Sequence, residues 1–204
     1  MILLLTTSGV RGESDGTTMN TIYTDRLRSL IDSIHSQPLR ETCRTLLTDA
    51  AFLKAPAAAK MHHAYTGGLV VHTVEVAEIA LQIAASTDDH TNAMLNRDIL
   101  LTAALWHDYC KIHEYTEVNG EWIYSTDNYN RRIGHITGSV LAFLVRAEAG
   151  CNNITQPTLD AITHAMLAHH GPVREWGSPV APQTIEALIL HQADMLSANF
   201  GATK

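Results

Sequence analysis

The chain is organised around the stretch Asn96-Arg-Asp-Ile-Leu-Leu-Thr-Ala-Ala-Leu-Trp-His-Asp-Tyr-Cys-Lys111. Asn96 is a favourable helix cap, and Asp98 follows in the first turn, where the helix dipole stabilises a carboxylate. Between residues 99 and 106 only Thr102 is polar, so this helix has almost no polar face. Such a pattern predicts a helix in the middle of a bundle, covered on all sides.

Asp108 stands out because it continues the apolar row formed by Leu101, Ala104 and Leu105 and follows directly after His107. Burying an unpaired carboxylate costs several kcal/mol even after relaxation. We therefore expect a compensating partner for Asp108, which can be an arginine, a hydrogen-bonded network or a metal ion.

Composition limits the possible classes of protein. A chain of 204 residues, 46% hydrophobic and 17% charged, is long enough for one globular domain with its own core. The net charge of −7 argues against an extended basic surface and against stable binding of duplex nucleic acid. The cysteines Cys43, Cys110 and Cys151 have no close spacing, which favours a reduced, cytoplasmic environment over a disulfide framework.

The N-terminal residues differ from the rest of the chain. We expect residues 1–20 to form a disordered tail and residues 21–204 to form a single domain. Met19 is an alternative translation start to Met1. The apolar run at residues 2–5 is too short for a membrane span, and no other run is expected to reach that length, so the sequence predicts a soluble protein without a membrane partner.

The hydrophobic pattern predicts an all-α fold. Around Asn119-Gly120, apolar and polar residues alternate, which predicts a small β-hairpin insertion near residues 115–125. Apart from the central helix, the expected helices cover residues 24–37, 42–53, 68–86, 131–148, 157–170 and 182 onward.

Histidines and aspartates recur at inward or terminal positions of these helices. His72 lies on the apolar stripe of its helix, which makes a hydrogen-bonded core histidine the ordinary interpretation for that residue alone. Five helical segments nevertheless contribute such side chains, and helix bundles build metal sites from convergent side chains of this kind. Imidazole and carboxylate donors without thiolate suit iron, manganese, nickel, cobalt or zinc. The residues concerned are His72, His107, Asp108, His135, His169, His170 and Asp194.

The order of these residues resembles the HD-domain superfamily of metal-dependent phosphohydrolases. Within it, local phrases are similar to the HD domain of the YhaM-like 3′-5′ exoribonucleases. These phrases are Ala55-Pro56-Ala57, His62-His63-Ala64-Tyr65-Thr66-Gly67-Gly68-Leu69, Gly134-His135-Ile136, His169-His170-Gly171 and Trp176-Gly177-Ser178-Pro179. Those exoribonucleases also carry an OB-type domain ahead of the HD domain, for which this chain is expected to have no room.

The resemblance implies an HD-domain helical bundle that binds one or two divalent ions. In mononuclear members the ligands match His72, His107, Asp108 and Asp194. In binuclear members the positions matching His135, His169 and His170 hold a second ion, with Asp108 between the two. Because this chain has the extra histidines, we favour two ions, roughly 3.5–4 Å apart, which activate a hydroxide for attack on phosphorus.

Further residues are candidates for the site. Lys111 can act as a catalytic cation on a phosphate oxygen, or it can pair with carbonyls at the helix C-terminus. Arg131 and Arg132 can contact phosphate, and Tyr115 and Trp176 can stack on a base, although solvated arginines and a buried tryptophan are equally ordinary. His191 and His63 are expected to support the metal ligands from behind.

The predicted function is a metal-dependent phosphodiesterase or exonuclease that cleaves short oligonucleotides or nucleotides. A nucleoside monophosphate phosphatase is an alternative, and a non-catalytic nucleotide-binding module is an alternative from another class. Release of inorganic phosphate separates the first two, and binding without turnover identifies the third. The sequence leaves the oligomeric state open.

Overall fold

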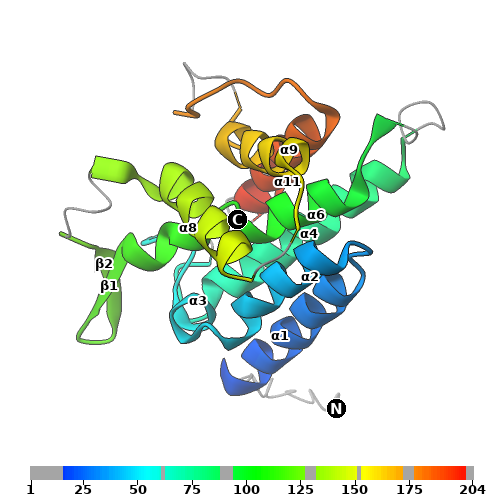
Figure 1. Ribbon diagram of the computed structural model, residues 1–204. Coiled ribbons are helices and arrows are strands. Elements are labelled where there is room, and N and C mark those ends of the chain that lie inside the picture. The colour runs from blue at the N-terminus through cyan, green and yellow to red at the C-terminus, as the bar shows by residue number, and fades with distance from the viewer. Residues whose placement is uncertain are drawn as a thin grey trace, which may run out of the picture.

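A computed structural model of the chain describes residues 16–60, 63–87, 94–126, 132–150, 153–171 and 177–200. Helices dominate these residues, and the strands form one two-stranded hairpin (Figure 1). The predicted all-α fold class with a small hairpin is therefore confirmed. The helices are α1 (Gly16–Asp32), α2 (Gln37–Arg44), η1 (Thr45–Thr48), α3 (Ala50–Lys54), α4 (Gly68–Ala85), α6 (Arg97–Trp106), η2 (Tyr109–His113), α8 (His135–Ala149), α9 (Gln156–Ala168) and α11 (Ile185–Phe200), where η marks 3-10 helices.

The centre of the bundle is α6, and it is buried from Ile99 to Trp106 as its sequence predicts. The Asn96 side chain caps the helix by accepting hydrogen bonds from the backbone N–H groups of Asp98 and Ile99, at 3.1 and 3.2 Å. Helix α6 packs against α4, α9 and α11, and α4 packs in turn against α1 and α11. The end of α6 consequently lies deep in the molecule, surrounded by other helices (Figure 1).

Two N-terminal expectations were wrong. Helix α1 begins at Gly16, so residues 16–20 belong to it rather than to a tail, while residues 1–15 lie outside the described residues. The helix expected over residues 42–53 is divided into the end of α2, η1 and α3. The division occurs at Asp49, whose side chain accepts hydrogen bonds from Ala51 and Phe52 N–H and starts a new helix there.

The hairpin pairs β1 (Tyr115–Val118) with β2 (Glu121–Tyr124) in antiparallel register. Asn119 and Gly120 form its two-residue turn with positive φ angles of 53° and 82°. These are the left-handed conformations that a type I′ turn requires, and Asn-Gly adopts them most readily. The predicted insertion is therefore confirmed, and it extends to one side of the helical body (Figure 1).

The last helices begin later than expected in two cases. Helix α8 begins at His135 rather than Arg131, and Arg131 lies outside the described residues. Helix α11 begins at Ile185 rather than Pro182, because the Thr184 hydroxyl accepts a hydrogen bond from Ala187 N–H and acts as the cap. Helix α9 does carry its proline in the first turn, as predicted.

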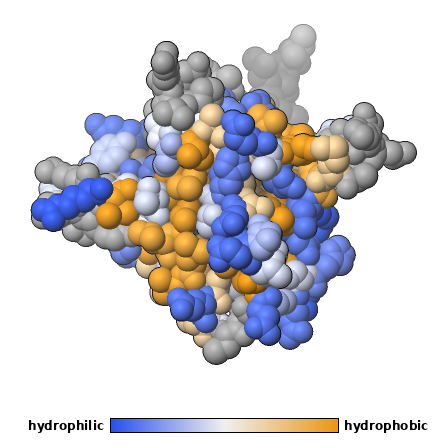
Figure 2. Space-filling view, turned by 45° about the horizontal axis from the view of Figure 1, so that its top comes forward, coloured by the Kyte–Doolittle hydropathy of each residue, from blue (hydrophilic) through white to orange (hydrophobic). Residues whose placement is uncertain are grey.

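Helix α4 reaches the length and apolar composition of a membrane span, contrary to the expectation that no run would do so. Most of this helix is buried against other parts of the molecule, as in the core helix of a globular domain. On the surface seen in Figure 2, a strip of apolar side chains lies beside polar ones. Exposed apolar side chains on α8 and α11 include Leu141, Val145, Leu188 and Leu196.

Candidate metal centre

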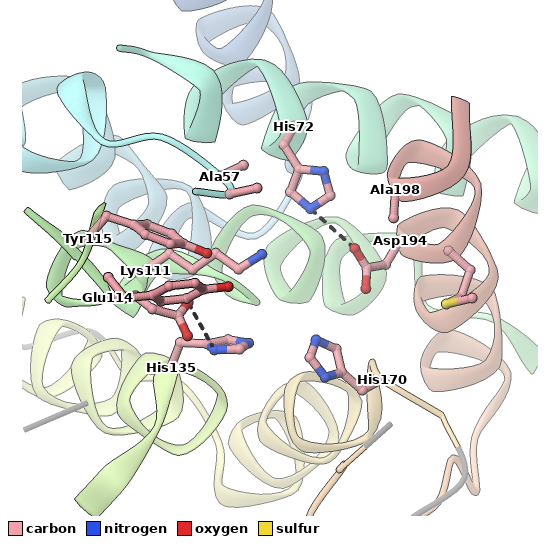
Figure 3. A pocket seen from close by; sticks show the side chains of 12 residues that line it. Ala57, His72, Lys111, Glu114, Tyr115, His135, His170, Asp194 and Ala198 are labelled. Atoms are coloured by element: carbon pink, nitrogen blue, oxygen red, sulfur yellow. Dashed lines mark ion pairs between the residues drawn. The ribbon is translucent and has the colours of Figure 1, made fainter. Parts of the chain in front are cut away.

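Histidine and aspartate side chains from separate helices converge around the end of α6. His72 comes from α4, His107 and Asp108 follow the last turn of α6, and Asp194 comes from α11. His135 opens α8, whereas His169 and His170 follow the end of α9. In Figure 3, His72, His135, His170 and Asp194 point into one shared space.

The first ligand set contains four buried residues whose donor atoms lie within 4.8 Å of one another: His72, His107, Asp108 and Asp194. Asp108 Oδ2 lies 3.3 Å from Nε2 of both histidines. Asp194 Oδ1 lies 3.2 Å from His72 Nε2. Burial lowers the pKa of His72, but its contacts with the two carboxylates outweigh this effect and raise it to about 9. The carboxylates thus favour a cation between them.

The second ligand set contains Asp108, His135, His169 and His170, again with donor atoms within 4.8 Å. Asp108 faces it with its other oxygen, Oδ1, at 3.5 Å from His135 Nε2 and 3.6 Å from His169 Nε2. These distances exceed those of normal hydrogen bonds. Asp108 Oδ1, His135 Nε2 and His169 Nε2 are buried and make no hydrogen bond to the described residues. Each such unsatisfied group lowers the stability of the fold by about 1–3 kcal/mol.

The histidine rings are held from behind so that their Nε2 atoms face the cluster. His107 Nδ1–H donates to the Ala104 carbonyl at 2.8 Å, and His169 Nδ1–H donates to the Met166 carbonyl at 2.6 Å. A carbonyl only accepts, so the proton lies on Nδ1 and leaves a lone pair on Nε2. This tautomer is the one that binds metal through Nε2. The donor atoms therefore fit a pair of divalent transition metal ions with Asp108 as the common ligand.

A pocket of about 330 Å³ opens beside the ligand sets. Its lining includes His72, His135, His170, Asp194 and Lys111, so both sets border the same space (Figure 3). The Lys111 ammonium lies 2.6 Å from Asp108 Oδ2. Burial lowers the pKa of Lys111, but the neighbouring carboxylates outweigh it and raise the pKa, so the lysine remains charged. Its ion-pair partner in the structure is this carboxylate rather than the helix C-terminal carbonyls.

The sequence of this chain matches a known protein family over the region that contains the cluster. The HD domain model matches residues 69–199, which include both ligand sets. The chain belongs to the HD-domain family. A second model, named for a helicase, matches residues 11–109, less than half of the chain. No solved structure matches the chain.

Curated relatives of this HD domain are named 3′-5′ exoribonuclease YhaM. The protein from Bacillus subtilis is 34% identical over 150 residues, covering 74% of this chain and 44% of the relative. The protein from a Geobacillus species is 30% identical over 176 residues, covering 85% and 51%. The chain therefore spans about half the length of these relatives. The predicted superfamily and the class of metal-dependent phosphohydrolase are confirmed.

The HD domain also has a hydrogen-bonded chain behind His72 that the sequence did not reveal. His72 Nδ1 lies 3.0 Å from Ser197 Oγ, and the Ser197 hydroxyl donates to Glu75 Oε2 at 3.1 Å. The same oxygen is 2.9 Å from His63 Nε2. Burial raises the pKa of Glu75, but the bonds from His63 and Ser197 outweigh it and lower the pKa, so Glu75 is a charged acceptor. Because Ser197 donates onward, His72 donates its Nδ1–H, and its Nε2 faces the ligand set.

Replacing Glu75 with glutamine is expected to weaken metal binding at the first ligand set about 10- to 100-fold, the range typical of partners that orient a metal ligand. The amide can donate as well as accept, so it no longer fixes the Ser197 hydroxyl and the His72 tautomer. Isothermal titration with Mn²⁺ measures the change.

Glu78→Gln is the matched control for this prediction, because Glu78 lies one turn further along α4 and pairs with Arg26 on α1. Equal metal affinity in Glu75→Gln and Glu78→Gln would show that the chain behind His72 has no positioning role.

Two other side chains, Glu114 and His191, support the cluster of the HD domain. Glu114 Oε2 lies 3.4 Å from His135 Nδ1, a contact that the sequence analysis missed. His191 Nδ1–H donates to the His169 carbonyl at 2.9 Å, so His191 lies behind a candidate ligand. Gly171 makes room for that ring, because a Cβ there would come within 2.3 Å of the imidazole. Burial and the nearby His169 lower the pKa of His170 to about 4, which keeps it neutral.

The other site residues predicted from the sequence are only partly among the residues that the structure describes. Tyr115 is buried and lines the pocket. Arg132 is exposed. Arg131 and Trp176 lie outside the described residues, as do His62 and Cys151, so their predicted positions stay untested. His63 lies three hydrogen bonds away from His72, through Glu75 and Ser197.

Proposed function

We propose that this HD domain is a metal-dependent phosphodiesterase, exonuclease-like in action, that cleaves phosphoester bonds of short oligonucleotides or nucleotides. The observation that carries the proposal is the position of Asp108, which offers one oxygen to each of two ligand sets beside a single pocket. The name of the curated relatives, 3′-5′ exoribonuclease, supports a nucleic acid substrate.

We assign His72, His107, Asp108 and Asp194 to one ion and Asp108, His135, His169 and His170 to the other. The absence of thiolates from both sets favours manganese, iron, nickel, cobalt or zinc. When bound, a pair of such ions lowers the pKa of water and stabilises the charge that develops on both oxygens of an in-line phosphoryl displacement.

The protein side chains have complementary tasks in this proposal. The Nε2 lone pairs, fixed by the Nδ1–H bonds of His107 and His169, require no reorganisation when cations enter. Lys111 brings a further positive charge to the pocket, where it can contact a non-bridging phosphate oxygen. The pocket volume of about 330 Å³ accommodates one nucleotide-sized group rather than a duplex. We place the enzyme in the cytosol and leave its oligomeric state open.

A manganese-supplemented panel of bis(p-nitrophenyl) phosphate, nucleoside monophosphates and short oligonucleotides tests the function. We expect hydrolysis of the diesters without release of inorganic phosphate from the monophosphates. Phosphate release from the monophosphates would instead identify a nucleotidase. Tight nucleotide binding without hydrolysis of any substrate would identify a binding module, and the proposal would then be wrong.

Replacing Lys111 with glutamine is expected to change two measurements in opposite directions. Removal of an ammonium 2.6 Å from Asp108 Oδ2 should tighten Mn²⁺ binding, because it removes repulsion between cations. Loss of a charge that contacts the reacting phosphate should lower kcat roughly 10²-fold. Titration calorimetry and hydrolysis of bis(p-nitrophenyl) phosphate measure these effects. A variant with unchanged kcat would exclude the catalytic role.

A further inference from the structure

A second hollow lies next to the pocket of the metal centre. It has a volume of about 460 Å³ and lies between residues 59–60 and 64–66 on one side and the tip of the hairpin on the other. Its lining includes Lys60, Tyr65, Thr66 and Trp122. None of these side chains belongs to either ligand set. We call this hollow the hairpin groove.

On both walls, the residues that line the hairpin groove adjoin in sequence those that line the pocket of the metal centre. On one wall, Ala57 and Ala58 line the pocket, and the next residue, Ala59, lines the groove. On the other wall, Tyr124 lines the pocket, while Trp122 lines the groove. Alternate residues of a strand share one face, so these two aromatic rings project from the same side of β2, about 7 Å apart along the strand.

The aromatic side chains of the groove are accessible but held in place. Tyr65 is 45% exposed. Trp122 is half-buried, and its indole N–H donates to Thr66 Oγ1 at 3.2 Å. The Lys54 ammonium lies 5.9 Å from the centre of the Trp122 ring. Rigid aromatic rings arranged along a groove are the usual platforms on which the bases of a single strand stack.

The charges around the groove favour stacking over a strong grip on phosphates. Lys54 is paired with Glu117 at 2.7 Å, which offsets its charge. Lys60 is exposed at the groove, but Glu121 also lines it. The groove thus has little net positive charge with which to bind a polyanion. A ligand that interacts mainly through flat aromatic faces fits it better.

We propose that the hairpin groove binds the nucleotide adjoining the scissile bond of a single-stranded oligonucleotide, with its base stacked on Trp122. This inference rests on the proposed phosphodiesterase function and narrows its substrate to strands of at least two nucleotides. The strand passes from the pocket at Tyr124 to the groove at Trp122, a distance that the backbone of one extended nucleotide can span.

The test compares long and short substrates on the manganese-loaded full chain. Trp122→Ala is expected to raise the Kd of a 5′-fluorescein-labelled phosphorothioate penta-adenylate, measured by anisotropy, about 5- to 100-fold. The same variant should hydrolyse bis(p-nitrophenyl) phosphate at the wild-type rate, because that small diester occupies the pocket alone. For the wild type, a plot of log Kd against log salt concentration should have a slope of only about 1, as expected for one or two phosphate contacts.

Two further variants separate stacking from a structural role. Trp122→Phe keeps an aromatic face and loses the bond to Thr66, so it should retain oligonucleotide affinity, as should Thr66→Val.

Each possible outcome decides between the proposals. The groove proposal would be overturned if Trp122→Ala lowered the hydrolysis rate of the small diester by the same factor as its affinity for the oligonucleotide. It would also be overturned if Trp122→Phe and Trp122→Ala lost the same amount of oligonucleotide affinity. If the wild type hydrolysed no diester, the proposed function would fail instead, and the anisotropy comparison would still judge the groove.

Discussion

Replacing Asp108 with alanine is expected to remove both metal ions and to lower kcat/KM for phosphodiesters by more than about 10³-fold. The carboxylate is the common member of the two ligand sets, with Oδ2 facing His72 and His107 and Oδ1 facing His135 and His169. Loss of a single electrostatic contact to a transition state already costs roughly 10²–10³ in rate. Elemental analysis and hydrolysis of bis(p-nitrophenyl) phosphate measure the two effects.

A folded variant is essential to this comparison, because Asp108 is buried and paired with Lys111. Asp108→Asn preserves the shape of the side chain, and circular dichroism verifies that both variants are helical. Asp160→Asn on α9 removes an exposed carboxylate and should retain the full metal content. Two ions per chain in folded Asp108→Ala would contradict the role of this residue as the shared ligand.

Replacing His169 with alanine is expected to reduce the metal content from two ions to one and to lower kcat roughly 10²-fold or more. His169 is fully buried, and its Nε2 belongs only to the second ligand set. The first set keeps all of its donors, so one ion should remain bound. The loss of rate follows because a single ion stabilises fewer of the oxygens that become charged during the displacement.

His164→Ala is the matched control for this prediction. His164 lies on α9, the helix that ends just before His169, and its Nε2 accepts a hydrogen bond from Gln183 N–H, away from the ligand sets. Its replacement should leave two ions in place. One ion per chain in the native protein as well as in His169→Ala would show that the centre is mononuclear.

The sequence predicted those parts of the fold that depend on patterns within one segment. The unbroken apolar run before His107 predicted the buried helix α6, and Asn119-Gly120 predicted the hairpin turn. Helix boundaries were less predictable, since a single side chain can set them. Asp49 and Thr184 each form a cap that only a hydrogen bond in the folded chain reveals.

The candidate site was predictable because its residues are chemically unusual in their surroundings. A histidine on an apolar stripe and a carboxylate at the end of a buried helix each require a partner. The supporting residues give no such signal: Ser197 and Glu75 are ordinary helix residues 122 positions apart, joined only in the folded structure. The same limit applies to the hairpin groove, whose walls come from distant segments.

The most direct test of the central claim is anomalous diffraction from crystals of the manganese-loaded protein. We predict two peaks, one beside Asp108 Oδ2 among His72, His107 and Asp194, and one beside Oδ1 among His135, His169 and His170. A single peak within the first ligand set, or no peak beside Asp108, would contradict the claim that this carboxylate joins two metal ions.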